Sequence, residues 1–332
     1  MAGVSTPSLA AAVSEAGALG SIALGASNAH QARTAIQELR TLTEKPFSVN
    51  LFTHRAAQAN PEREARWLEH LRPYFEALGA SPPPRLREIF TSFLADPVML
   101  DILVREAPPV ASIHFGLLEP SWIAALHGVG CVLMATATSL PEALAIEAAG
   151  IDVVVAQGYE AGGHRGIFDP NVKPAIGTLA LTRLLASRLR IPVVAAGGIM
   201  DGQGIASVLR LGAAGAQLGT AFILCPESSA TDHHRQLLRQ PGGRRTAVTT
   251  AISGRPARGV VNRYFCDIGA SGHPPIPDYP LAYDAARCLH AAAAARGLQE
   301  YSVNLAGQGF ALSREMPAKH LVETLVAEMT RS

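Results

Sequence analysis

Short apolar runs alternate with helical patterns along the first two thirds of the chain, and this alternation limits the possible folds more than any other feature. The runs are rich in Val, Ile, Leu and Ala, and they are continuous rather than alternating with polar residues. Continuous apolar strands separated by helices predict a parallel sheet covered by helices. Seven strands are predicted, at residues 20–25, 46–52, 110–115, 131–137, 152–156, 192–196 and 214–218.

The repeating units have the size used by a TIM or (β/α)8 barrel, and a doubly wound sheet is the alternative. The barrel is favoured because glycines of functional character follow several separate strand ends, whereas a doubly wound sheet gathers them at one switch point. Helices are predicted between the strands at 6–16, 28–43, 85–94, 98–105, 120–126, 141–149, 177–189 and 202–211.

Two regions break the alternation, and they predict the domain organisation. Residues 53–84 are polar and Pro-rich with one predicted helix at 62–78, which indicates an insertion in a barrel domain covering 1–227. From residue 228 to 332 no further strands are predicted. Ala-rich helices at 281–296 and 317–331, joined by Gly- and Pro-rich sequence, predict a smaller, mainly helical lid region packed on the barrel.

Composition excludes several classes of function. A formal net charge of +1 among 332 residues gives no electrostatic basis for binding nucleic acid or an anionic membrane. No apolar run approaches the ~18 residues of a membrane span, and the N-terminus lacks the basic start of a signal peptide. The four cysteines are far apart, which suits free thiols in the cytoplasm. No metal-ligand spacing occurs, and His233 and His234 are predicted to be solvated.

The stretch Val153–Gly166, VVVAQGYEAGGHRG, predicts an active-site loop. Its glycines cannot serve a packed helix or strand, but they allow the backbone to turn sharply and approach a flat ligand. The loop also delivers His164 and Arg165 to the end of a strand. A lone histidine is more often incidental, but the flanking glycines and a second glycine-rich strand end favour a functional one.

That second feature is Ala195-Ala196-Gly197-Gly198, followed about twenty residues later by Gln217-Leu218-Gly219-Thr220. Each set ends a predicted strand, and exposed backbone N–H groups at such turns bind anions. In barrels, the loops after the seventh and eighth strands are the usual phosphate site. Two tight structural turns are the alternative reading.

These motifs make the chain similar to nitronate monooxygenase, formerly called 2-nitropropane dioxygenase. AGGHRG after VVVAQGYE, together with PVVAAGGIMDG and AAGAQLGTAFILCPES, resembles that family, and the opening MAGVSTPSLAAAVSEAGALGSIALG and PFSVNLF match its class I pattern. The family binds FMN in a TIM barrel and oxidises alkyl nitronates with O2 to a carbonyl compound and nitrite. The resemblance therefore implies an FMN-dependent oxidoreductase, with a small nitronate or nitroalkane and O2 as partners; a homodimer stays open.

The resemblance also assigns roles to residues. His164 corresponds to the catalytic histidine, a general base for neutral nitroalkanes that otherwise helps to hold the nitronate. His114, Tyr301 and Gln308 are candidates for the substrate pocket, although His114 fits equally well as a packed side chain. The predicted cofactor-binding residues are Met1, Ala2, Gly3, Asn50, Gln157, Gly162, Gly163, Gly197, Gly198, Gln217, Leu218, Gly219 and Thr220.

Three alternatives and one departure stay open. An FMN-dependent enoyl-acyl-carrier-protein reductase shares the E-A-G-G-H loop but uses NAD(P)H. A purine-nucleotide dehydrogenase shares the phosphate turns but needs a cysteine in a Gly/Ser-rich loop, which this chain lacks. A barrel that binds a phosphorylated ligand without turnover is the third. Family members carry a strand before M-A-G, whereas this sequence starts at M-A-G. Either the start codon is placed too late, or the barrel lacks its first strand and has an exposed edge.

Overall fold

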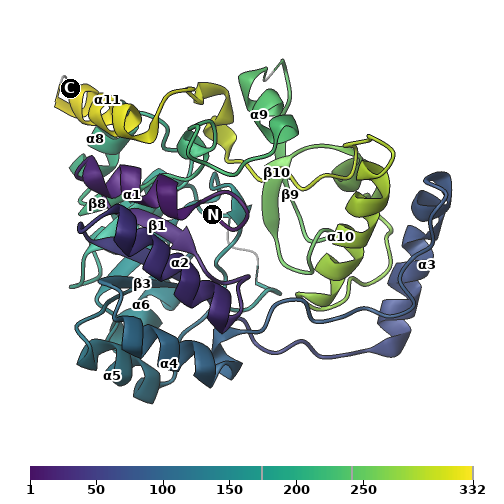
Figure 1. The fold of residues 1–332 in the computed structure, drawn as a ribbon, viewed down its shortest axis with the longest axis horizontal. Helices are drawn as coiled ribbons and strands as arrows, with labels where there is room; N and C mark the ends of the chain where they lie inside the picture. Colours follow the sequence, from purple (N-terminus) through teal and green to yellow (C-terminus); the bar gives the residue numbers. More distant parts are fainter. Residues whose placement is uncertain (173–174, 241, 331–332) are drawn as a thin grey trace.

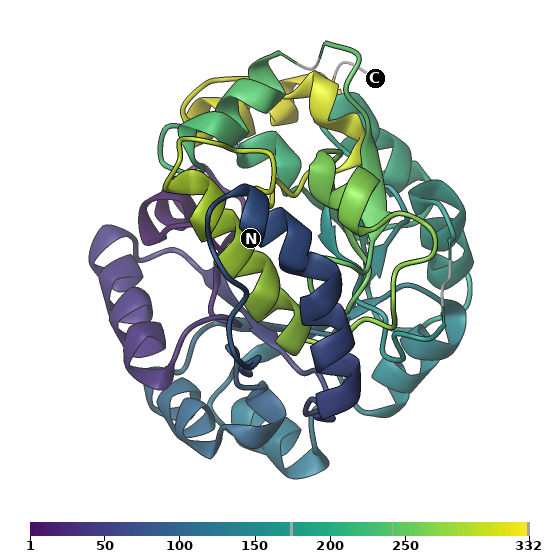
Figure 2. The same ribbon diagram turned by 90° about the vertical axis from the view of Figure 1, so that its right-hand side faces the viewer.

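The central feature of the computed structural model is a curled sheet of seven parallel strands, seen end-on in Figure 2. The structure describes residues 1–332 except 173–174, 241 and 331–332. The sheet runs in the order β1 (Gly20–Ala23), β2 (Phe47–Phe52), β3 (Val110–His114), β4 (Val132–Ala137), β5 (Val153–Gln157), β7 (Val193–Ala196) and β8 (Gly215–Gln217). The prediction of a TIM-type parallel barrel sheet is confirmed, with β1 and β8 as its two edges.

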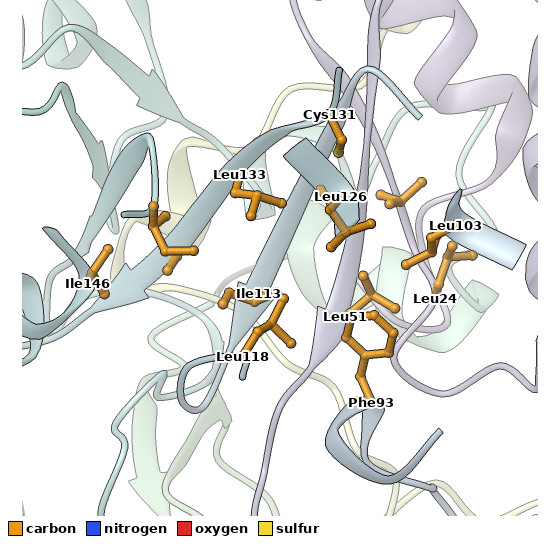
Figure 3. Close-up of a cluster of buried hydrophobic side chains, with 14 of the residues drawn as sticks. Leu24, Leu51, Phe93, Leu103, Ile113, Leu118, Leu126, Cys131, Leu133 and Ile146 are labelled. Atoms are coloured by element: carbon orange, nitrogen blue, oxygen red, sulfur yellow. The ribbon is translucent and has the colours of Figure 1, made fainter. Parts of the chain in front are cut away.

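Helices cover the outer surface of the sheet, as the alternation predicted. They are α1 (Pro7–Glu15), α2 (Ala29–Leu42), α4 (Pro97–Glu106), α5 (Pro120–Gly128), α6 (Leu140–Ala148), α7 (Thr178–Ala186) and α8 (Gly202–Arg210). Figure 3 shows side chains such as Leu51, Ile113 and Leu133 from the strands meeting Leu103 and Leu126 from the helices. Fully burying each such side chain contributes about 1.5–3 kcal/mol, so this layer is the main source of stability.

The inner face of the sheet changes from apolar to polar along the strands. Because side chains alternate between faces, Val153 and Val155 of β5 point into the barrel and Gln157 follows them on the same side. Asn50 of β2 and Ser112 of β3 occupy the same level. The barrel interior is therefore closed by apolar side chains below and opens among polar ones at the carboxyl ends of the strands.

Strands do occur after residue 228, so that prediction was wrong. A small antiparallel sheet has the order β6 (Gly163–His164), β10 (Ala257–Val260) and β9 (Thr246–Thr249). Its strands are too short and too mixed in polarity to be recognised from periodicity. β10 exists because it pairs with the active-site loop, almost a hundred residues earlier in the chain.

The predicted helix at 85–94 is also absent, apart from the 3-10 turn η1 (Phe93–Ala95). Tertiary contacts hold this segment open, because the Arg87 N–H donates to the carboxylate of Asp284 and Leu86 packs among residues of the tail. These contacts override the local helical preference.

The insertion and the tail form one layer over the mouth of the barrel (Figures 1 and 2). Helix α3 (Pro61–Ala77) packs on α10 (Leu281–Ala294), with Trp67 and Leu289 fully buried between them. The other elements of the tail are η2 (Thr220–Phe222), α9 (Asp232–Arg239), the π-helix η3 (Tyr264–Ile268) and η4 (Gln308–Leu312).

The last helix, α11 (Ala318–Thr330), returns to the barrel and packs against α8 and α1. The predicted end of this helix at residue 331 lies outside the described residues. Within the described ranges, no helix is both long and apolar enough to cross a membrane. The division of the chain into domains at residues 227 and 228 stays a prediction.

Candidate active site

A single cavity of about 1060 Å³ opens at the carboxyl ends of the barrel strands and extends beneath the tail. It joins the two glycine-rich loops singled out in the sequence. The residues predicted for the site that line it are Met1, Ala2, Gly3, Asn50, His114, Gln157, Gly162, Gly163, His164, Gly197, Gly198, Gln217, Leu218, Gly219 and Thr220.

Tyr301 and Gln308 do not line this cavity, so their placement in the pocket was wrong. Tyr301 is 1% exposed and packs in the layer between α3 and α10, where its ring lies 6.2 Å from that of Tyr74. The Gln308 side chain is exposed, and only its backbone N–H reaches the site, donating to the carbonyl of Glu160. The tail does cross the rim as predicted, but it lines the cavity with Asn304 and Gly307 instead.

The tail holds the glycine loops together by backbone contact. The Gly307 N–H donates to the Thr220 hydroxyl at 2.9 Å. A Cβ atom on Gly162 would lie 2.4 Å from the Gly307 nitrogen, and one on Gly197 would lie 3.0 Å from the Ala161 nitrogen. Only glycine allows these approaches, so the loop that carries His164 and the two phosphate-type turns form the wall of one cavity.

Several backbone N–H groups on that wall have no hydrogen-bond partner within the described residues. Among them are those of Gly198, Gly219 and Thr220. Gly198 has φ +71°, a left-handed conformation that glycine adopts without strain. Unpaired amides are costly unless water or a ligand accepts from them. Gly198 follows β7, and Gly219 and Thr220 follow β8, the strand ends at which barrels commonly bind phosphate.

His164 lines the same cavity. Its Nε2 is 2.8 Å from the Ser253 hydroxyl, and its ring packs edge-on against Phe115 and Tyr279. Burial lowers the pKa of His164 to about 3, and the nearby charges of His114 and Arg255 add to the effect. The ring is therefore neutral at ordinary pH.

His114 supports His164 through the backbone. Its Nε2–H donates to the His164 carbonyl at 3.1 Å, and its Nδ1 accepts from the Thr136 hydroxyl at 3.0 Å. Gln157 donates to the same carbonyl at 3.0 Å and accepts from the Gly166 N–H at 2.8 Å. Both side chains thus fix the loop while facing the cavity, and burial lowers the pKa of His114 to about 4. His114 is thus both packed against the loop and part of the cavity wall, so the two interpretations of this residue are compatible.

Three buried arginines lie behind the loop without a carboxylate partner in the described chain. Arg165, Arg255 and Arg258 are each 2% exposed. They donate to backbone carbonyls, and Arg255 and Arg258 stack on the rings of Phe115 and Tyr159 at 4.5 and 4.8 Å. Burial lowers the pKa of Arg165 and of Arg255 to about 10, which leaves both charged. Unpaired positive charge beside a cavity favours an anionic ligand.

Several residues near His164 were missed in the sequence because they come from the tail. Ser253 contacts the imidazole, while Tyr279 and Tyr283 line the cavity beside it. Arg255 stacks behind Phe115, whose φ of +89° is rare for a residue with a side chain. The sequence did contain one signal for these residues, which is the pair of arginines in the Gly/Pro-rich stretch 254–259. Such a stretch is an unusual place for charged side chains that the fold buries.

Asn50 lies on the cavity wall, as predicted, and its amide donates to Ser112 at 3.2 Å. None of the four cysteines lines the cavity. The polar helix expected to expose both His233 and His234 buries His234 to 6% exposure, so the solvated reading was wrong for that residue. Besides histidines, the titratable groups that line the cavity in the described residues include the α-amino group of Met1, whose pKa burial lowers to about 6, and Arg287 of α10.

A parallel α/β barrel with a cavity at the carboxyl ends of its strands and a neutral histidine on the cavity wall belongs to the class of TIM-barrel enzymes. A family model described as nitronate monooxygenase matches residues 1–328. The chain belongs to this family of flavin-dependent oxidoreductases, which confirms the resemblance read from the sequence.

Individual relatives agree. The chain is 56% identical to the nitronate monooxygenase of Pseudomonas aeruginosa over 99% of its length and 94% of the relative. It is 54% identical to the nitronate monooxygenase of Paraburkholderia phytofirmans, over 100% of this chain and 91% of the relative. Among solved structures it is similar to a nitroalkane oxidase from Streptomyces ansochromogenes, with a TM-score of 0.91, 39% identity and coverage of 100% and 94%. FabK from Thermotoga maritima aligns with a TM-score of 0.73, 29% identity and coverage of 100% and 91%.

Proposed function

We propose that this enzyme binds FMN and oxidises alkyl nitronates with O2 to a carbonyl compound and nitrite. One observation carries the proposal: unpaired amides suited to a phosphate and a neutral histidine share one cavity, in a chain of the nitronate monooxygenase family. When bound, FMN would supply the redox chemistry. The chain's own residues bind, orient and exclude water.

The residues present fit FMN in two respects. Gly198, Gly219 and Thr220 would hold its phosphate through their unpaired N–H groups. The flat ring system needs close approach to backbone, and a Cβ atom on Gly3 or Gly163 would enter open space in the cavity. Asn50 and Gln157 would contact the polar edge of the ring. The same role extends to the other predicted contacts: Met1, Ala2, Gly162, Gly197, Gln217 and Leu218.

The buried arginines favour the anionic nitronate over a neutral nitroalkane. Arg255 lies behind Phe115, and its charge lowers the pKa of His164, so its positive potential extends to the space beside the imidazole. A base with a pKa of about 3 is a weak proton acceptor. Preformed nitronates are therefore the expected better substrates, with neutral nitroalkanes turned over slowly through His164 as general base.

The test begins with the absorbance spectrum of the purified protein, which should show bound flavin. Adding a preformed alkyl nitronate in air should consume O2 and release nitrite and the carbonyl compound. Denaturing the protein should release FMN, identified by its mass. Flavin binding without consumption of nitronate would refute the proposed reaction and leave a barrel that only binds its ligand.

The alternative reaction is reduction by NAD(P)H, as in an enoyl-acyl-carrier-protein reductase. The shared E-A-G-G-H loop keeps this alternative in view. Anaerobic mixing separates the two: rapid bleaching of the flavin by NADH or NADPH favours the reductase, whereas bleaching by nitronate alone favours the monooxygenase.

A further inference from the structure

Ser253 is the closest polar neighbour of His164, and the sequence gave no reason to select it. Its side chain is fully buried, and its hydroxyl oxygen lies 2.8 Å from Nε2 of the imidazole. We propose that Ser253 is a positioning residue that fixes His164 with its proton on Nε2, so that the unprotonated Nδ1 faces the ligand. The inference rests on the proposed function and defines which of two roles His164 plays in it.

The hydroxyl carries one proton, so its hydrogen bonds can be assigned. Ser253 Oγ is 3.1 Å from the carbonyl oxygen of Arg255, to which it donates, and it accepts from the Arg255 N–H at 3.2 Å. In the described chain this hydroxyl is the donor to that carbonyl. Arg255 is buried, and leaving its carbonyl without a donor would cost free energy. The proton between Ser253 and His164 must then come from the ring, so Nε2 is the donor.

A neutral imidazole has a single N–H, and burial beside Arg255 keeps His164 neutral. Protonation of Nε2 therefore leaves Nδ1 with a free lone pair. Nδ1 makes no hydrogen bond within the described chain, and the residue lines the cavity. The backbone on the other side of the ring is held separately, since His114 and Gln157 both donate to the His164 carbonyl.

The assignment distinguishes two roles. An unprotonated Nδ1 can accept the proton on the α-carbon of a neutral nitroalkane. The C–H bond breaks, its electron pair passes into the nitro group to form the nitronate, and the ring becomes an imidazolium that still donates from Nε2 to Ser253. The same nitrogen cannot donate a hydrogen bond to an oxygen of a preformed nitronate. Ser253 should therefore matter for neutral nitroalkanes and little for nitronates.

The direct test is nitrogen NMR of the flavin-loaded protein labelled with 15N-histidine, with the His164 signals assigned by their loss in His164→Gln. Protonated and unprotonated ring nitrogens have distinct chemical shifts. We expect a protonated Nε2 and an unprotonated Nδ1 at pH 7 in the wild type, and a mixture of the two forms in Ser253→Ala. A protonated Nδ1 in the wild type would overturn the proposal, and this readout requires no turnover.

Kinetics provide the second measurement. In Ser253→Ala, kcat for a neutral nitroalkane should fall about tenfold, equivalent to about 1.4 kcal/mol, while KM and the turnover of a preformed nitronate change less than about twofold. Ser14→Ala is the matched control. Ser14 is 2% exposed, and its hydroxyl likewise donates to one carbonyl and accepts from one N–H, but it contacts no histidine. An equal loss with both substrates would show a merely structural role.

If Ser253→Ala does not fold, Ser253→Cys retains an atom at the γ position and weakens the acceptor, and the wild-type spectrum alone still decides the tautomer. Failure of the proposed function looks different. In that case no nitronate is oxidised by the wild type, whatever the protonation of His164.

Discussion

Acidification should destabilise this protein because it buries histidines in neutral form. Burial lowers the pKa of His54 to about 4, with a contribution from the charge of Arg255, and burial lowers the pKa of His234 to about 4 as well. Their side chains are 0% and 6% exposed. A histidine in the unfolded chain has a pKa of about 6.5, so below pH 6.5 the unfolded state binds protons that the folded state does not.

The contribution of these histidines to the free energy of unfolding is fully present above pH 6.5 and is lost as the pH falls toward 4. A pH of 5 lies about 1.5 units below the pKa of a histidine in the unfolded chain. At about 1.4 kcal/mol per unit, each of the two histidines costs about 2 kcal/mol, or about 4 kcal/mol together. At about 2 °C per kcal/mol for a chain of this size, Tm should fall by ~8 °C between pH 7 and pH 5. The lowered pKa values of His114 and His164 act in the same direction.

The assay is urea unfolding at pH 7 and pH 5, with the free energy of unfolding extrapolated to water. The informative variant is His54→Phe, which keeps an aromatic ring against Tyr279 and Phe115 but cannot be protonated. Its loss of stability between the two pH values should be smaller than that of the wild type by about 2 kcal/mol. His30→Gln, at an exposed position of α2, is the control and should match the wild type. An undiminished pH dependence in His54→Phe would refute the reasoning.

Three further outcomes are expected at the site. His164→Asn should retain flavin absorbance and lose about 10²-fold or more in kcat for a neutral nitroalkane, because general-base catalysis contributes at least that much; unchanged turnover would remove His164 from the mechanism. Gly162→Ala should lower the free energy of unfolding by about 1–3 kcal/mol, measured by urea unfolding, because its Cβ would collide with the backbone of Gly307. Gly198→Ala should lower the ratio of flavin to protein in the purified enzyme, whereas Gly243→Ala has the same left-handed backbone in open space and should not.

Much of the barrel could be predicted from sequence because its signals are local. A continuous apolar run such as 153–157 predicts a buried parallel strand without knowledge of its neighbours. The glycines at 162–163 and 197–198 identify close backbone approaches for the same reason. Side chains two residues apart in a strand point to the same face, so Ser112 follows Val110 on the inner face and Thr136 follows Met134. The sequence therefore contained enough information to place both residues.

The remaining errors have one physical cause, which is dependence on partners far away in the chain. β10 and the extended segment 85–92 are shaped by tertiary contacts, and neither has a periodicity of its own. Ser253 and Tyr279 lie in irregular sequence and reach His164 only through the fold of the tail. Tyr301 was misplaced for the converse reason, since an aromatic residue on the returning segment packs equally well into the adjacent apolar layer.

Helix α11 has a consequence for how the barrel keeps its shape. It lies against both α1 and α8, the helices that precede the two edge strands (Figure 1). Its Leu321 and Leu325 are buried in one cluster with Leu9. Within the described residues no ladder of main-chain bonds joins β1 and β8. The seam is bridged by this packing and by single hydrogen bonds, such as that from the Ser229 N–H to the Val4 carbonyl at 2.9 Å. Such a seam can widen without breaking a strand pair, so the circumference of the barrel at this point depends on the packing of α11 and on a few hydrogen bonds.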